Sequence, residues 1–191
     1  MSRVVIEECK SYEVENIISK VDDGIEKLGG WSKFVKPGDK VLLKVNLIGP
    51  KTPESGAVTN CEFVRALVRI LKRQNCIVWI GDSAGGAIGG IAPTAQALNV
   101  SGLVKVAKEE GAEIKNFDKE GVVPVSLESK LEDTMYIAKP MKDPKFTASK
   151  ELRVQFTFAA FSMAAAGIIV CLPDRATKST SAFSTPIGMV R

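Results

Sequence analysis

Segments of strand length alternate with segments of helical period between residues 4 and 117, and this alternation limits the fold more than any other feature. Four apolar runs have the length of strands, at residues 4–6, 40–45, 76–80 and 113–117. Three segments of helical period separate them, beginning near Val14, Thr59 and Ser101. Strands that alternate with helices usually pair in parallel. We therefore expect an α/β fold with a mostly parallel sheet and helices on both faces.

Several residues are typical of the ends of these helices. Gly29 and Gly111 follow the first and third helices, and glycine readily adopts the left-handed conformation that ends a helix. Thr59 and Glu62 have the spacing of a capping box, in which both side chains bond to free backbone N–H groups. We expect Thr59 to cap the second helix and Ser101 to cap the third.

An uncharged segment of 20 residues, 154–173, has two interpretations. A helix of this length can span a bilayer and would anchor the protein in a membrane. The segment also has an alanine-rich middle, with Gly167 before the β-branched run 168–170. We therefore expect a helix to Ala166 and then a buried strand, and keep the membrane anchor as the alternative.

The length of 191 residues is enough for one domain with a hydrophobic core. Residues 122–127 and 135–138 are predicted to form a small antiparallel excursion from the main sheet. We expect a single α/β domain over 1–173 and a divergent tail over 174–191.

Composition excludes several classes of function. The sequence has no histidine, which excludes catalytic triads and metal sites that depend on imidazole. Its four cysteines form no CxxC pair, so we expect no cofactor in this chain and reduced thiols in the cytoplasm. The net charge of +4 comes from scattered residues, and we expect no nucleic-acid partner. We expect no signal peptide, because the apolar run at the start of the sequence is short and is followed at once by acidic residues.

Polar residues gather at the expected strand ends and at one helix start. Nine residues form the predicted ligand site: Lys44, Asn46, Thr59, Asn60, Gly81, Asp82, Ser83, Gly85 and Gly86. Open α/β sheets bind ligands at the carboxyl edge of their strands. A glycine-rich loop after a strand, like the first turn of a helix, presents backbone N–H groups to phosphate. The sequence therefore predicts a small anionic or phosphorylated ligand at this edge.

Each part of this site also has a purely structural interpretation. Lys44 and Asn46 can be ordinary polar residues at a strand end, the glycines can simply permit a flexible loop, and Thr59 can simply cap its helix. Asp118 is a fourth candidate contributor to the site. A carboxylate such as Asp82 can also hold a divalent metal, although no set of metal ligands in the sequence supports one. No catalytic residue is identified.

Three motifs together resemble a bacterial and archaeal family, the domain of unknown function 362: Lys44-Val-Asn-Leu47, Ala57-Val-Thr-Asn60 and Gly81-Asp-Ser-Ala-Gly85. The resemblance extends from Val4 to Pro173 and implies an α/β fold. Many members carry a ferredoxin-like iron–sulfur segment, so the resemblance implies a redox-associated role. It also implies an alternative function, in which a non-catalytic module docks onto an iron–sulfur or electron-transfer partner.

The sequence departs from the family pattern after Leu172-Pro173. Family members continue with a stretch that contains lysine, threonine and histidine, whereas residues 174–180 contain no histidine here. The cysteines of an iron–sulfur segment are absent from the sequence as well. Our hypothesis is a truncated or reading-frame-altered member, in which an exposed sheet edge would favour self-association.

Overall fold

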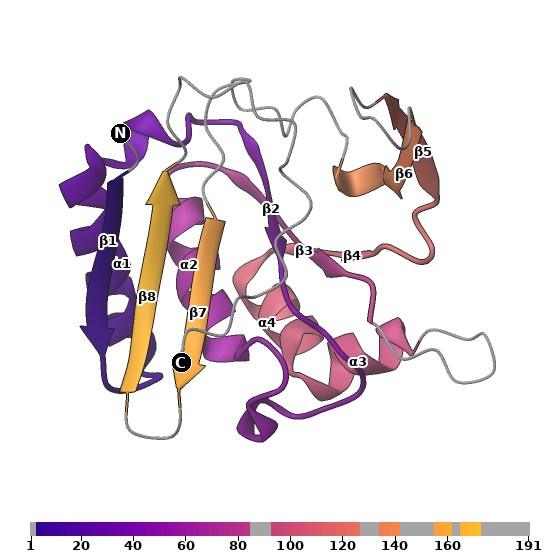
Figure 1. Cartoon of the computed structure of the whole chain (residues 1–191), viewed down its shortest axis with the longest axis horizontal. Coiled ribbons are helices and arrows are strands. Elements are labelled where there is room, and N and C mark those ends of the chain that lie inside the picture. Colours follow the sequence, from indigo (N-terminus) through magenta and orange to yellow (C-terminus); the bar gives the residue numbers. More distant parts are fainter. Residues whose placement is uncertain (1–2, 85–92, 127–133, 142–154, 162–164, 173–191) are drawn as a thin grey trace.

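The computed structural model describes residues 3–84, 93–126, 134–141, 155–161 and 165–172 (Figure 1). Its helices are α1 (Val14–Leu28), α2 (Cys61–Arg73), α3 (Thr94–Val100) and α4 (Leu103–Glu110). Its strands are β1 (Arg3–Cys9), β2 (Lys40–Lys44), β3 (Ile77–Asp82), β4 (Glu113–Asn116), β5 (Val122–Ser126), β6 (Thr134–Ala138), β7 (Gln155–Phe161) and β8 (Ala165–Leu172). The predicted α/β class is confirmed.

The parallel part of the fold is a sheet of three strands in the order β2-β3-β4. Lys40 pairs with Ile77 at the start of β2, and Asp82 pairs with Asn116 at the end of β3. The antiparallel excursion is also confirmed, because β5 and β6 pair with each other to form a two-stranded sheet.

The first strand lies in a different sheet from the one that its place in the alternation predicts. β1 pairs antiparallel with β8, and β7 completes this second sheet in the order β1-β8-β7. Figure 1 shows these three strands side by side, with α1 behind them. Of the four strands that the alternation predicts for the parallel sheet, the described residues place three in it, namely β2, β3 and β4. Local sequence pattern identifies a strand but not a partner more than 150 residues away.

The prediction of a helix up to Ala166 is wrong. Residues 155–161 form strand β7, which pairs antiparallel with β8. Polar and aromatic residues alternate in Gln155-Phe-Thr-Phe158, a period of two that is typical of a strand and outweighs the alanines that follow. Both strands lie in the segment of the membrane-anchor alternative, and its described residues, 155–161 and 165–172, are extended rather than helical. Nowhere in the described ranges is a helix long and apolar enough to cross a membrane.

The helix ends agree with the sequence in part. Gly29 (φ 113°) ends α1 and Gly111 (φ 68°) ends α4, both in the left-handed conformation as expected. The predicted caps of α2 and α4 are wrong, because Asn60 rather than Thr59 caps α2 and Gly102 precedes α4. Ser101 instead ends α3, a short helix that the sequence pattern did not indicate.

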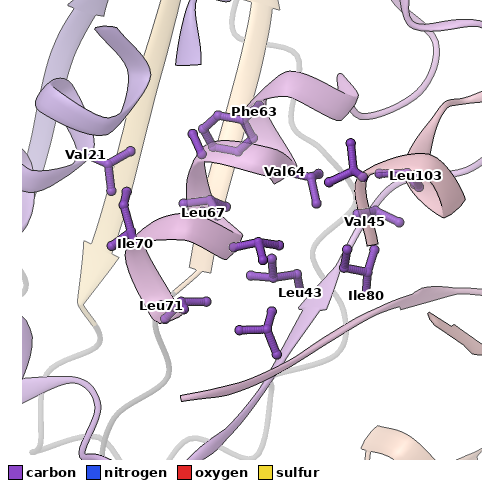
Figure 2. Close-up of a cluster of buried hydrophobic side chains, with 14 of the residues drawn as sticks. Val21, Leu43, Val45, Phe63, Val64, Leu67, Ile70, Leu71, Ile80 and Leu103 are labelled. Carbon is purple, nitrogen blue, oxygen red and sulfur yellow. The ribbon is translucent and has the colours of Figure 1, made fainter. Parts of the chain in front are cut away.

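The hydrophobic core lies where α2 packs against the parallel sheet and its neighbouring helices (Figure 2). Side chains of α2 that recur every three or four residues, such as Phe63, Leu67 and Leu71, are buried on one face. Leu43 of β2 and Ile80 of β3 lie opposite them. Each large apolar side chain buried in this way contributes about 1.5–3 kcal/mol to folding. This packing fixes the start of α2 relative to the ends of β2 and β3.

Candidate functional site at the carboxyl edge of the parallel sheet

The three predicted segments meet at one edge of the parallel sheet. Because β2, β3 and β4 run in the same direction, their last residues Lys44, Asp82 and Asn116 share that edge. The backbone of Asn46 joins the start of α2 to this edge through two hydrogen bonds with Thr59. The Asn46 N–H donates to Thr59 Oγ1 (2.8 Å), and the Thr59 N–H donates to the Asn46 carbonyl (3.1 Å).

Lys44 and Asp82 form an ion pair at this edge. Lys44 Nζ lies 2.8 Å from Asp82 Oδ1, and the Leu47 N–H donates to Asp82 Oδ2, also at 2.8 Å. Asp82 is buried, with 5% of its surface exposed, whereas the Lys44 side chain is 52% exposed. Lys44 Nζ also donates to the Val45 carbonyl at 3.1 Å. The buried carboxylate therefore holds the ammonium group in place from the inside, and the lysine faces outward.

Ser83, Thr94 and Asp118 form a second hydrogen-bonded cluster beside the first. Ser83 Oγ donates to Asp118 Oδ1 at 2.5 Å, and the Thr94 hydroxyl donates to the other carboxylate oxygen. Thr94 is buried and also accepts from the Ala84 N–H at 2.8 Å. No sequence motif pointed to Thr94, since its role depends on β4 lying next to β3. Asp118, the fourth candidate in the sequence, joins the cluster.

The other predicted site residues have local structural contacts. Asn60 Oδ1 accepts from the Glu62 N–H at 2.8 Å as the cap of α2, and Asn46 Nδ2 donates to the Ala57 carbonyl at 3.2 Å. Gly81 lies within β3 rather than in a loop, and a Cβ atom there would lie 2.6 Å from both Lys115 O and Phe117 Cε1. Gly85 and Gly86 lie outside the described residues, as does the tail over 174–191.

A family model described as a domain of unknown function (DUF362) matches residues 41–149. This chain belongs to the DUF362 family. The matched range contains all nine predicted site residues, and it is shorter than the range 4–173 over which the resemblance was expected.

The DUF362 chain also has a curated relative, the "Thylakoid-associated protein sll1697" of Synechocystis sp. (strain ATCC 27184 / PCC 6803 / Kazusa). The two are 36% identical over 98 residues, which is 48% of this chain and 30% of the relative. The chain therefore spans less than a third of that protein's length. No solved structure matches.

The described part of this DUF362 chain contains no group of three Asp, Glu, Cys or His residues that could hold a metal ion. Cys61 and Cys76 are free thiols. Burial raises the pKa of both, and nearby carboxylates add to the effect, Glu62 for Cys61 and Asp39 for Cys76. A raised pKa keeps a thiol protonated and poorly nucleophilic at neutral pH. Neither cysteine has the environment of a reactive thiolate.

A separate hollow of about 480 Å³ lies on the helical side of the DUF362 chain, lined by Glu15, Ile18, Arg69, Lys72, Arg73 and Glu110. Its two arginines already have partners in the protein. Arg69 bonds to Glu110 (2.9 Å) and Arg73 to Asp22 (2.7 Å). These ion pairs connect neighbouring helices, so we assign the hollow a structural role and place the candidate site at the sheet edge.

Proposed function

We propose that this DUF362 domain binds a small anionic or phosphorylated ligand at the carboxyl edge of β2-β3-β4, with Lys44 as the main contact to the anion. The observation that carries this proposal is the placement of Lys44. The Lys44 side chain is half-exposed, and its ammonium group is held by Asp82 Oδ1 and the Val45 carbonyl. An ammonium group has three N–H donors, so two are used within the described residues and one is left for a ligand.

The direction of the ion pair supports binding from outside. Asp82 is buried, and each of its carboxylate oxygens accepts a hydrogen bond from the protein, Oδ1 from Lys44 and Oδ2 from the Leu47 N–H. The ligand would approach the exposed side of Lys44, where it does not need to displace Asp82. A lysine held in this way loses less side-chain entropy on binding than a free surface lysine does.

The start of α2 adds a smaller attraction. Backbone N–H groups at a helix start carry partial positive charge, and α2 begins beside Asn46. Asn60 already satisfies the Glu62 N–H, and the Glu62 carboxylate opposes an anion at this helix start. We therefore assign Thr59, Asn60 and Asn46 to the framework of the site, and Lys44 to contact with the anion.

The test is isothermal titration of the purified protein with inorganic phosphate and with a set of nucleoside monophosphates at low ionic strength. We expect Lys44→Met to weaken binding at least tenfold. Lys44→Met leaves the buried Asp82 carboxylate without its partner, which lowers stability. The double variant Lys44→Met/Asp82→Asn should weaken binding equally and recover that stability, because the neutral Asn side chain still accepts the Leu47 N–H. Lys108→Met, an exposed lysine on α4, is the matched control and should bind as the parent does. Parent-like binding by the double variant, or no binding by the parent, would overturn the proposal.

Docking onto an iron–sulfur or electron-transfer partner, a redox-associated role and a cytoplasmic location stay predictions for this chain. The curated relative is described as thylakoid-associated, which is a property of that protein. Affinity purification of the tagged chain from its native cells, followed by metal analysis of the partners, tests the docking alternative. An iron-containing partner retained equally by the parent and by Lys44→Met would favour docking over ligand binding.

A further inference from the structure

The candidate site has two ends with opposite hydrogen-bonding character. At the β2 end, Lys44 offers a positive charge and an N–H donor. At the β4 end, Ser83 and Asp118 are both exposed, and Ser83 donates its hydroxyl hydrogen to Asp118 Oδ1 at 2.5 Å. A carboxylate only accepts hydrogen bonds, and a serine whose single hydrogen is used can then only accept as well. The β4 end therefore presents acceptors.

This arrangement is held firmly in place. The bond from Ser83 to Asp118 is charge-assisted, and such bonds are roughly twice as strong as those between neutral groups. Buried Thr94 donates to the other oxygen of Asp118, and the Asp118 N–H donates to Asn116 Oδ1 at 3.1 Å. A ligand that needed a donor from Ser83 would first have to break the bond to Asp118. A ligand that supplies a donor would not.

We propose that the ligand of this site carries hydroxyl groups beside its anionic group, with the anion at Lys44 and the hydroxyls donating to Ser83 Oγ and Asp118. This inference rests on the proposed function and specifies its ligand as a hydroxylated phosphate or carboxylate. Charge sets the orientation, because an anion beside Asp118 would be repelled and one beside Lys44 attracted.

The spacing of the strands suits a ligand with a short carbon chain. Neighbouring strands lie about 4.8 Å apart, so β2 and β4, on either side of β3, are about 10 Å apart. Lys44 Nζ contacts Asp82 at the end of β3, and Asp118 bonds to Ser83 directly after it, so both groups lie closer to β3 than their own strands do. A phosphate ester of a five-carbon polyhydroxylated chain is of the right size to connect the two ends.

The experiment compares two phosphate esters with the same number of carbons by isothermal titration. One is ribose 5-phosphate, which carries hydroxyls, and the other is n-pentyl phosphate, which carries none; inorganic phosphate measures the anion contact alone. We expect the parent to bind ribose 5-phosphate about tenfold more tightly than pentyl phosphate, since hydrogen bonds to a charged group are the strong ones. Ser83→Ala and Asp118→Asn should each reduce this preference to about twofold and leave the affinity for inorganic phosphate within twofold of the parent.

Ser19→Ala, an exposed serine on α1, is the control and should keep the full preference. Ser83 is exposed, so Ser83→Ala still tests the inference if Asp118→Asn does not fold. Equal binding of the two esters by the parent would overturn this inference and leave the proposed function standing. No binding of either ester or of inorganic phosphate would overturn both. A preference that appears only with added Mg²⁺ would assign the β4 end to a cation and overturn the hydroxyl contact.

Discussion

Two clusters of charged side chains in this domain use similar residues in different ways. In the helical cluster, Arg65 of α2 bonds to Glu109 and Glu110 at the end of α4, at 2.7 and 2.8 Å. Arg69 bonds to the same Glu110, so each charge has a partner on a neighbouring helix. At the sheet edge, Lys44 and the pair of Ser83 and Asp118 keep donor or acceptor capacity directed outward. Charged groups that all pair with one another connect the helices that carry them. Charged groups that keep free hydrogen-bonding capacity toward solvent are also suited to contact a ligand.

The pKa values in the helical cluster agree with a structural role. Bonds from Arg69, together with weaker effects of Arg65, lower the pKa of Glu110 although burial opposes this change. Burial by itself would lower the pKa of Arg65, but its bonds to Glu62, Glu110 and Glu109 raise it above the usual value. Both shifts stabilise the charged forms, and therefore the contact between α2 and α4.

The largest effect is expected from Asp82→Ala. This change removes the acceptor of the buried Leu47 N–H and the ion-pair partner of the half-exposed Lys44. Because most of the loss comes from the unsatisfied N–H, we expect the free energy of unfolding to fall by about 2–4 kcal/mol. Asp82→Asn keeps an acceptor for Leu47 and should cost less. Urea denaturation followed by circular dichroism measures both. A loss below about 1 kcal/mol for Asp82→Ala would show that the sheet-edge pair is not structurally important.

Gly81→Ala tests how tightly the same edge is packed. The added Cβ would lie 2.6 Å from a backbone oxygen of Lys115, and we expect a loss of about 2–3 kcal/mol because the strands must move apart. Gly24→Ala in α1 is the control, since its Cβ would have neighbours no closer than 3.8 Å. Alanine favours a helix, so this control should be neutral or stabilising by up to about 1 kcal/mol. Equal effects of the two changes in thermal unfolding would contradict the packing argument.

Glu110→Gln tests the helical cluster through pH. We expect it to cost about 1–2 kcal/mol at pH 7, because two arginines lose their shared carboxylate. Folding lowers the pKa of Glu110, so its contribution is fully present above the unfolded pKa of about 4.3 and is lost as pH falls through the lower folded pKa. Urea titrations between pH 7 and pH 3 should show the parent and the variant converging in acid. A constant difference across that range would disprove the linkage.

The smallest effect is expected from Arg73→Met at the edge of the helical cluster. Arg73 lies 2.7 Å from Asp22, but its side chain is 51% exposed, so solvent weakens the pair. We expect a loss of no more than about 0.5 kcal/mol, which decreases further in high salt. Thermal unfolding at low and high salt measures it. A loss above about 2 kcal/mol would mean that exposed and half-buried pairs contribute alike in this domain.

Local pattern predicts much of this fold because helical period and glycine act over a few residues. The stripe of α1, its end at Gly29 and the runs that become β2 to β4 all depend on neighbours in sequence. The sequence pattern places the cap of α2 one residue too early, because Thr59 and Asn60 can both cap a helix. The competing bond from Asn46 to Thr59 comes from another segment.

The candidate site was predictable in place but not in detail. The parallel order predicts that Lys44 and Asp82 share an edge, although they are 38 residues apart. It does not show that they pair with each other, because side-chain direction at strand ends depends on how the chain leaves the sheet. Thr94 could not be predicted at all, since its partners Ala84 and Asp118 come from two other segments.

The pairing of β1 with β8 has a consequence for synthesis of the protein. Val5 of β1 pairs with Val170 of β8. Because the two residues are far apart in sequence, β1 leaves the ribosome long before β8 has been synthesised. At about 5–20 residues per second the delay is roughly 10–30 seconds. The three strands of the parallel sheet are all synthesised once Asn116 has been added, well before β8 begins at Ala165. During that interval the backbone N–H and C=O groups of nascent β1 lack their partners in β8 and can pair with other chains. We expect chaperones to be of most use to this polypeptide at that stage.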